Sequence, residues 1–527
     1  MHTILPFMLA MVAAVVLLEM LAAKLKIAYP ILLVVAGLLV SFIPGLPRIK
    51  VDPDLIFFII MPPLLFEASW SISFKEMKKW WRIITSFAFV VVFFTAMAVA
   101  VAVNYYIPGF SIALGFLLGG IVAPPDAVST AAITRFVSIP RATSAILEGE
   151  SLLNDASSLI IFRFALVAVG TGQFLLPDAV TSFLWMVIGG AGIGLLLAWL
   201  FVQMHKRLRM DASSNMAFNL IEPYLMYWVA EQLHCSGVLA VVLGGLFLSN
   251  RRLEFLDSES RIQAINVWES FVFILNGIVF LIIGLDLPEI VEGMRASGTS
   301  VHTGIIYGIM VTAILVLARL ISAYSAMIAT YLFRPSVMPS RSRRQVMLIP
   351  LTLGWSGMRG VVSLAAALAI PVTLENGMPF PQRNLILFIT FTVILLTLVI
   401  QGLTLPLLIK YTGVFENLAV NGTSPEETRQ QMKHGLKQHI YQFLKTKYDN
   451  EPNGNAGIEK MLRLWEERAK AADDSGMTAR NKAIFVELLE SQRQYLTELN
   501  KDPNIDEGII RAQLYQIDLE EERLKII

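Results

Sequence analysis

The first 411 residues alternate long apolar runs with short polar segments. Many of these runs are about twenty residues long, which is enough for a helix to cross the hydrocarbon core of a bilayer. The pattern predicts about thirteen transmembrane helices. We expect them at 4–23, 29–45, 54–70, 81–106, 109–134, 144–169, 178–203, 214–233, 236–250, 263–285, 303–333, 347–370 and 382–410.

The pattern changes near residue 412, where the apolar runs stop and charged residues become frequent. Apolar residues close to the C-terminus still recur at near-helical spacing, as in an amphipathic helix. We therefore expect an all-α polytopic membrane protein, with a transmembrane domain over 1–411 and a cytoplasmic helical tail over 412–527.

Composition supports a membrane protein, because 55% of the residues are apolar and only 16% are charged. Soluble domains carry about 25% charged residues. The formal net charge of +1 says nothing about partners, and we expect no nucleic-acid partner. The single cysteine, Cys235, excludes an intrachain disulfide, and no histidines and carboxylates occur at metal-ligand spacing, so we expect no cofactor,.

Lysine and arginine are concentrated in alternate loops, for example at 75–82, 206–209 and 334–344. Basic loops stay on the cytoplasmic side of a membrane. With about thirteen spans, this places the N-terminus outside and the C-terminus in the cytoplasm. We expect a multi-pass protein of the cell inner membrane.

The segment GESLLNDASS (149–158) places polar residues within an apolar span. On a helix, Glu150, Ser151, Asn154, Asp155 and Ser158 fall within an arc of about 140°. A charged side chain at the bilayer centre costs about 2.5–3.5 kcal/mol on insertion scales. This polar stripe is therefore predicted to face a protein interior or a water-filled cavity.

Two other spans carry signals of interrupted helices. In GGIVAPPDAVST (119–130), Pro124 and Pro125 donate no N–H and should unwind the helix just before Asp126,. In GWSGMRGVV (354–362), glycines surround Arg359. Interrupted spans at corresponding places in two halves are typical of inverted repeats, whose broken helices cross at an ion-binding site.

The intramembrane arginines have several possible roles. Arg319 is expected to form an architectural ion pair with Glu150. For Arg359 the sequence leaves open an ion pair, a side chain that reaches the interface, or a gate or support of the interrupted span. Pro125 is a second candidate gate or support of the same region.

Several stretches together resemble the monovalent cation:proton antiporter-1 family, the sodium/proton exchangers, and fit its bacterial branch best. GESLLNDA (149–156) matches the motif of that family's sixth span. FFIIMPPLLFEASW (57–70), PYLMYWVAEQLHCSGVLAVVLGGL (223–246) and WSGMRGVVSLA (355–365) resemble three further stretches of the family. The resemblance covers about residues 5–411. The family usually has Thr-Asp-Pro in its fifth span, whereas this chain has Pro125-Asp126-Ala127.

The resemblance implies an antiporter that exchanges Na⁺, with Li⁺ or K⁺ as alternatives, for H⁺. Asp155 would carry the proton and, with Asp126, bind Na⁺, while Asn154 and Ser151 would complete the site. One carboxylate that binds either a proton or a cation would give electroneutral 1:1 exchange by alternating access. Such an exchanger would serve pH and sodium homeostasis. The implied protein is a homodimer in the lipid bilayer.

Three other classes are weaker matches. An intramembrane aspartyl protease also uses two aspartates, but its GxGD and PAL signatures are missing, so we do not expect an enzyme. A channel would need a selectivity-filter repeat, and the sequence shows none. A cation-coupled solute symporter is the nearest alternative, because broken helices and aspartate sites occur in both kinds of transporter.

Overall fold

The computed structural model describes residues 4–43, 55–126, 141–172, 176–208, 210–296, 298–333, 343–374, 377–412 and 479–526, with isolated residues between 432 and 443. Within these ranges the ordered elements are helices, apart from one isolated bridge between Thr373 and Pro379. The predicted all-α class is confirmed. The end of the predicted span 109–134, from residue 127 on, lies outside the described residues.

Among the described residues, seven helical stretches are long and apolar enough to cross a membrane. They are Pro6–Leu25, Phe74–Tyr106, Thr143–Thr171, Val180–Arg207, Ser258–Ala296, Val301–Ala329 and Arg383–Tyr411. Shorter apolar helices occupy Tyr29–Val40, Ile56–Ser71 and Ile112–Val122. The chain is therefore a multi-pass membrane protein, and the number of about thirteen spans stays a prediction.

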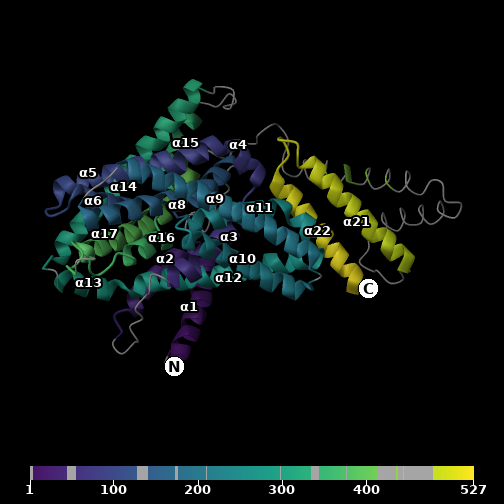
Figure 1. Cartoon of the computed structure of the whole chain (residues 1–527), viewed down its shortest axis with the longest axis horizontal. Helices are drawn as coiled ribbons and strands as arrows, with labels where there is room; N and C mark the ends of the chain where they lie inside the picture. The colour runs from purple at the N-terminus through teal and green to yellow at the C-terminus, as the bar shows by residue number, and fades with distance from the viewer. Residues whose placement is uncertain are drawn as a thin grey trace. The chain divides into compact units, whose positions relative to one another are not determined.

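One group of helices packs into what we call the core bundle. It consists of α4 (Phe74–Thr85), η2 (Ser86–Val91), α5 (Val92–Tyr106), α6 (Ile112–Val122), α8 (Arg141–Thr171), α14 (Val301–Phe333), α15 (Arg343–Trp355), α16 (Val361–Leu368), α17 (Arg383–Leu396), η4 (Thr397–Gln401) and α18 (Gly402–Thr412). Figure 1 shows α5, α6, α14 and α17 running side by side. Helices α5 and α6 can approach this closely because Gly119 has no Cβ. A Cβ at this position would lie only 2.5 Å from the Ala96 carbonyl oxygen.

A second group, which we call the scaffold, is held together by similar close approaches. It consists of α1 (Ile4–Leu25), α2 (Tyr29–Val40), η1 (Leu55–Ile60), α3 (Met61–Ser71), α10 (Ala212–Gln232), α11 (Gly237–Phe255) and α12 (Ser258–Leu285). A Cβ on Gly37 would lie 2.2 Å from the carbonyl oxygen of Leu281, so only glycine lets α2 approach α12 this closely. The long helix α9 (Leu176–Arg207) follows the core helix α8, and α13 (Leu287–Ala296) follows α12.

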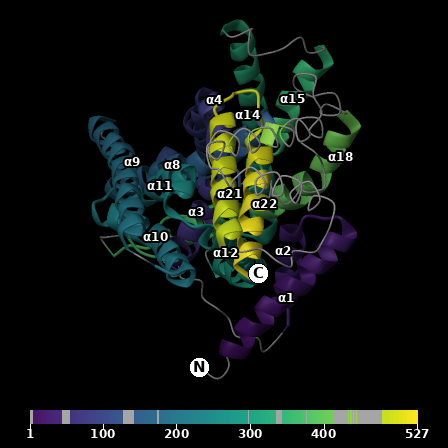
Figure 2. The same cartoon turned by 90° about the vertical axis from the view of Figure 1, so that its right-hand side faces the viewer.

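The contacts divide the chain into two compact units, and the smaller one comprises 209–216, 252–266 and 419–527. Its helices α21 (Ala479–Leu499) and α22 (Glu507–Ile526) lie side by side, as Figure 2 shows. They share a hydrophobic core that includes Leu489, Leu496 and Ile510. The expected helical character of the C-terminal region is thus present in its described part.

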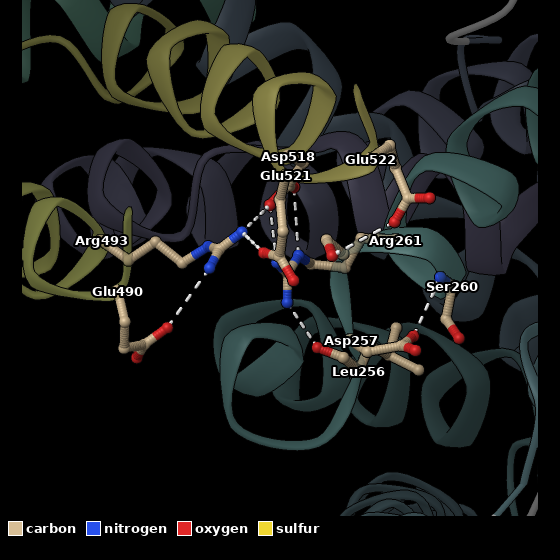
Figure 3. A network of polar contacts seen from close by, with 10 residues as sticks. Leu256, Asp257, Ser260, Arg261, Glu490, Arg493, Asp518, Glu521 and Glu522 are labelled. Atoms are coloured by element: carbon tan, nitrogen blue, oxygen red, sulfur yellow. Dashed lines mark hydrogen bonds and ion pairs between the residues drawn. The ribbon is translucent and has the colours of Figure 1, made fainter. Parts of the chain in front are cut away.

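A buried charge network also belongs to this smaller unit (Figure 3). Arg261 donates from Nε and Nη2 to the two carboxylate oxygens of Asp518, at 3.1 and 2.6 Å. Arg493 donates to the same carboxylate at 2.9 Å and also contacts Glu521. Burial lowers the pKa of Arg493, but its bonds and charge contacts with Glu521 and Asp518 raise that pKa above its ordinary value. A bidentate carboxylate shared by two arginines fixes its partners in one arrangement.

Candidate functional site

The predicted unwinding before Asp126 is confirmed. Helix α6 starts at an N-cap, Ser111, and ends at Val122. Pro124 and Pro125 follow, and because neither can donate a backbone N–H, the helix cannot continue,. The segment 123–126 is non-helical, with residues 123–125 buried. Irregular backbone at this depth is stable only where protein or water satisfies its polar groups.

The second predicted interruption is also present, between α15 and α16, and the two breaks meet. The backbone N–H of Asp126 donates to the carbonyl of Met358 at 2.7 Å. A Cβ on Gly360 would lie only 2.6 Å from the Asp126 Cγ. Glycine at this position therefore allows the Asp126 carboxyl to lie against the second break.

Arg359 supports the end of α6. Its buried guanidinium donates from Nε to the Val122 carbonyl at 2.5 Å and also contacts the Gly357 carbonyl. Its backbone N–H donates to Thr397 Oγ1 at 3.1 Å. A cation at the C-terminus of a helix also interacts favourably with the helix dipole. Of the roles that the sequence leaves open for Arg359, this geometry favours support of the broken backbone.

The polar stripe of α8 faces the same unwound segment. Ser151 Oγ and Asn154 Nδ2 both donate to the Pro125 carbonyl, at 3.3 and 3.2 Å. Asp155 follows Asn154, is only 8% exposed, and is close enough to Asp126 for the two charges to interact. The structure therefore brings together Asp155, Asp126, Asn154, Ser151 and Pro125, and their roles in binding a cation stay a prediction.

Asn154 has a further feature. Its side-chain oxygen Oδ1 is buried, and no described atom of the chain donates a hydrogen bond to it. A buried carbonyl oxygen without a partner costs free energy unless something else satisfies it. Beside two carboxylates, this oxygen is a suitable ligand for a hard cation, which prefers oxygen donors.

The expected ion pair between Glu150 and Arg319 is present. Arg319 Nη1 and Nη2 donate to the two Glu150 oxygens at 2.7 and 3.0 Å, and both residues are buried. A Cβ on Gly357 would lie 2.5 Å from Arg319 Cδ, so the pair packs directly against the second break. Such a bidentate pair fixes the relative positions of α8 and α14.

Sequence reasoning did not single out a second buried polar cluster, in which His205 Nε2 lies 2.8 Å from Glu222 Oε1. Asn219 donates to the other Glu222 oxygen at 2.7 Å and accepts from Trp268 at 2.7 Å. The sequence does contain an indication of this cluster, because Glu222 lies inside an apolar span, directly before Pro223. Asn219 lies three residues from Glu222 on α10, but His205 and Trp268 come from α9 and α12, and spacing could not pair them with this helix.

Two interrupted helices that meet beside a buried carboxylate are the arrangement expected at an ion site of a secondary transporter. The family model for the sodium/hydrogen exchanger, transmembrane, matches residues 10–411. An uncharacterised Na⁺/H⁺ exchanger of Mycobacterium tuberculosis is 29% identical over 98% of this chain and 95% of its own length. A Bacillus subtilis protein named sodium, potassium, lithium and rubidium/H⁺ antiporter is 33% identical over 72% of this chain and 58% of its own length.

Among solved structures, the sodium proton antiporter MjNhaP1 from Methanocaldococcus jannaschii has the same fold. It matches with a TM-score of 0.62 at 19% identity, over 78% of this chain and 98% of that chain. The chain belongs to the sodium/hydrogen exchanger family. It is therefore a cation/proton antiporter rather than an enzyme, and the solute symporter has no support.

Proposed function

We propose that this antiporter exchanges a monovalent alkali cation, Na⁺ first, for H⁺ in a 1:1 electroneutral cycle at Asp155. The observation that carries the proposal is the unpartnered Asn154 Oδ1 beside Asp155 and Asp126, where the broken helices cross. Carboxylate and amide oxygens suit a hard cation. The name of the Bacillus subtilis relative leaves K⁺, Li⁺ and Rb⁺ as further substrates.

The cycle follows from competition for one carboxylate. A charged Asp155 in a buried site is costly, so it moves across the membrane cheaply only when a proton or a cation neutralises it. Asn154 is a neutral amide, so the stripe offers one exchangeable charge at this point rather than two adjacent ones. One cation then replaces one proton in each cycle.

Alternating access needs two bodies that move against each other. We assign the moving body to the core bundle, which carries both breaks, and the fixed body to the scaffold, which would also form the homodimer contact. The distribution of basic loops supports an outside N-terminus and a cytoplasmic C-terminus in the cell inner membrane. In that orientation residues 412–527 form a cytoplasmic helical tail, and the protein serves pH and sodium homeostasis.

Everted membrane vesicles with a pH-sensitive dye test the assignment. Asp155→Asn should abolish the dye response to added Na⁺, Li⁺ and K⁺, because an amide cannot exchange a proton for a cation. Glu254→Gln, on the exposed end of α11, is the matched control and should respond like wild type. Proton–cation exchange by a correctly inserted Asp155→Asn variant would contradict the proposal.

A further inference from the structure

A surface groove lies between the start of the core bundle and helix α9. Its volume is about 520 Å³, within the range of small-molecule sites,. Phe89 and Val90 of η2 form one wall, and Phe183 and Val187 of α9 form the other. The rings of Phe89 and Phe183 meet edge to face, with their centroids 6.4 Å apart.

The mouth of this groove has a different chemistry. Trp81 and Arg82 line it, and the Arg82 guanidinium lies 5.5 Å from the centre of the Trp81 ring. Both residues belong to α4, whose sequence FKEMKKWWRIIT also exposes Lys78 and Lys79. Tryptophan together with lysine and arginine on an amphipathic helix is typical of the boundary between lipid headgroups and acyl chains.

The groove therefore has a cationic mouth and an apolar interior. Val90 lies eight residues beyond Arg82, or about 12 Å deeper along a helix. Trp81 is 53% exposed and Val90 50% exposed, so this face is open to the surrounding lipid. On α9, Leu184 and Ile188 beside the groove are also exposed. A ligand from the bilayer can enter sideways, whereas a water-soluble ligand would have to cross apolar surface.

We propose that this groove binds an anionic phospholipid, with the phosphate at Arg82 and an acyl chain between Phe89, Val90, Phe183 and Val187. Charge complementarity selects the headgroup, because the Arg82 guanidinium lines the mouth and no carboxylate is among the lining residues, while Lys78 and Lys79 are exposed on the same helix α4. Each basic residue near a membrane surface strengthens the binding of anionic lipid about fivefold. The bound lipid contacts both the core bundle and α9.

Native mass spectrometry of the purified full-length protein, with phosphatidylglycerol or phosphatidylcholine added, tests the site. Wild type should retain phosphatidylglycerol in preference to phosphatidylcholine. Arg82→Gln should reduce that preference about fivefold, whereas Arg207→Gln, an exposed cation at the end of α9, should keep it. Val187→Trp should fill the groove and reduce retention of both lipids, whereas Ile188→Trp on the adjacent exposed position should not.

Equal losses in Arg82→Gln and Arg207→Gln, or unchanged retention in Val187→Trp, would overturn the proposal. Displacement of phosphatidylglycerol by inorganic phosphate would also overturn it, since the acyl chain would then contribute nothing. If Val187→Trp does not elute as a folded species, a phosphatidylglycerol with a photoreactive acyl chain replaces it. Crosslinks to Phe89 or Phe183 would support the site, and crosslinks confined to other helices would exclude it.

Discussion

An ion pair between the core bundle and the scaffold predicts a change in the balance between the two access states. Arg163 on α8 donates from Nη2 to Glu231 Oε2 of α10 at 2.6 Å. Arg163 lies eight residues beyond Asp155, about 12 Å along the helix axis. In the proposed orientation it lies on the outer side of the ion site. The pair must break if the core bundle moves against the scaffold to open that side.

The size of the effect follows from the exposure of the two side chains. Arg163 is 40% exposed and Glu231 is 17% exposed, so water screens much of the attraction. Exposed ion pairs contribute about 0.2–1 kcal/mol. A loss of about 1 kcal/mol from one of two states shifts their ratio about fivefold. Neutralising the pair should therefore shift the balance toward the outward-open state without abolishing exchange.

The assay compares the Na⁺ concentration for half-maximal exchange in right-side-out and everted vesicles. Arg163→Gln should lower that concentration by up to about fivefold on the outer face, and Glu231→Gln should do the same. In the wild type, Glu231 Oε1 accepts a hydrogen bond from the Gly237 N–H at 3.2 Å. Glutamine at 231 keeps an oxygen that can accept this bond. Arg163→Lys keeps the charge and is the matched control. Half-maximal concentrations equal to wild type on both faces, or a lysine variant as altered as the glutamine variant, would refute the reasoning.

Three further substitutions have expected outcomes. Arg319→Met should lower the free energy of unfolding by about 3–5 kcal/mol, because it leaves Glu150 buried without its partner. The yield of monodisperse protein should fall, and exchanging the two residues should restore it. Gly360→Ala should abolish exchange in the dye assay while the protein still inserts, because the added Cβ would lie 2.6 Å from the Asp126 Cγ. Arg261→Gln should make α22 more sensitive to limited proteolysis, because it removes the bidentate contact to that helix.

The residues of the candidate ion site could be recognised from the sequence because polar side chains are conspicuous in an apolar span. Placing Asp155 and Asp126 in apolar spans costs free energy, which indicates that they have a function. Consecutive prolines must end a helix. The helical repeat alone then places Ser151 and Asn154 on the face that contacts the break. Local rules were sufficient here, because each of them acts within a few residues.

The partners of Arg359 and Arg261 could not be predicted in the same way. Arg359 donates to a carbonyl 237 residues away, and Arg261 contacts a carboxylate 257 residues away. Neither acceptor has a distinctive sequence, since one is a backbone oxygen and the other belongs to a charged amphipathic helix. Only the packing of distant helices decides such contacts, so spacing along the chain leaves several roles open.

The departure of this chain from the usual fifth-span motif now has a structural consequence. Pro125 stands where the family has a threonine, so it offers the cation no side-chain oxygen. Its carbonyl already accepts from Ser151 and Asn154, which saturates both lone pairs,. Among the described residues, Asn154 Oδ1 is a neutral oxygen that stays available beside the carboxylates, and the Ser151 hydroxyl, which only donates to Pro125, keeps its acceptor lone pairs,. Binding of a cation here would depend more on the charge of the carboxylates and less on a fitted shell of neutral ligands. Such a site favours tolerance of several alkali ions over strict selection of one.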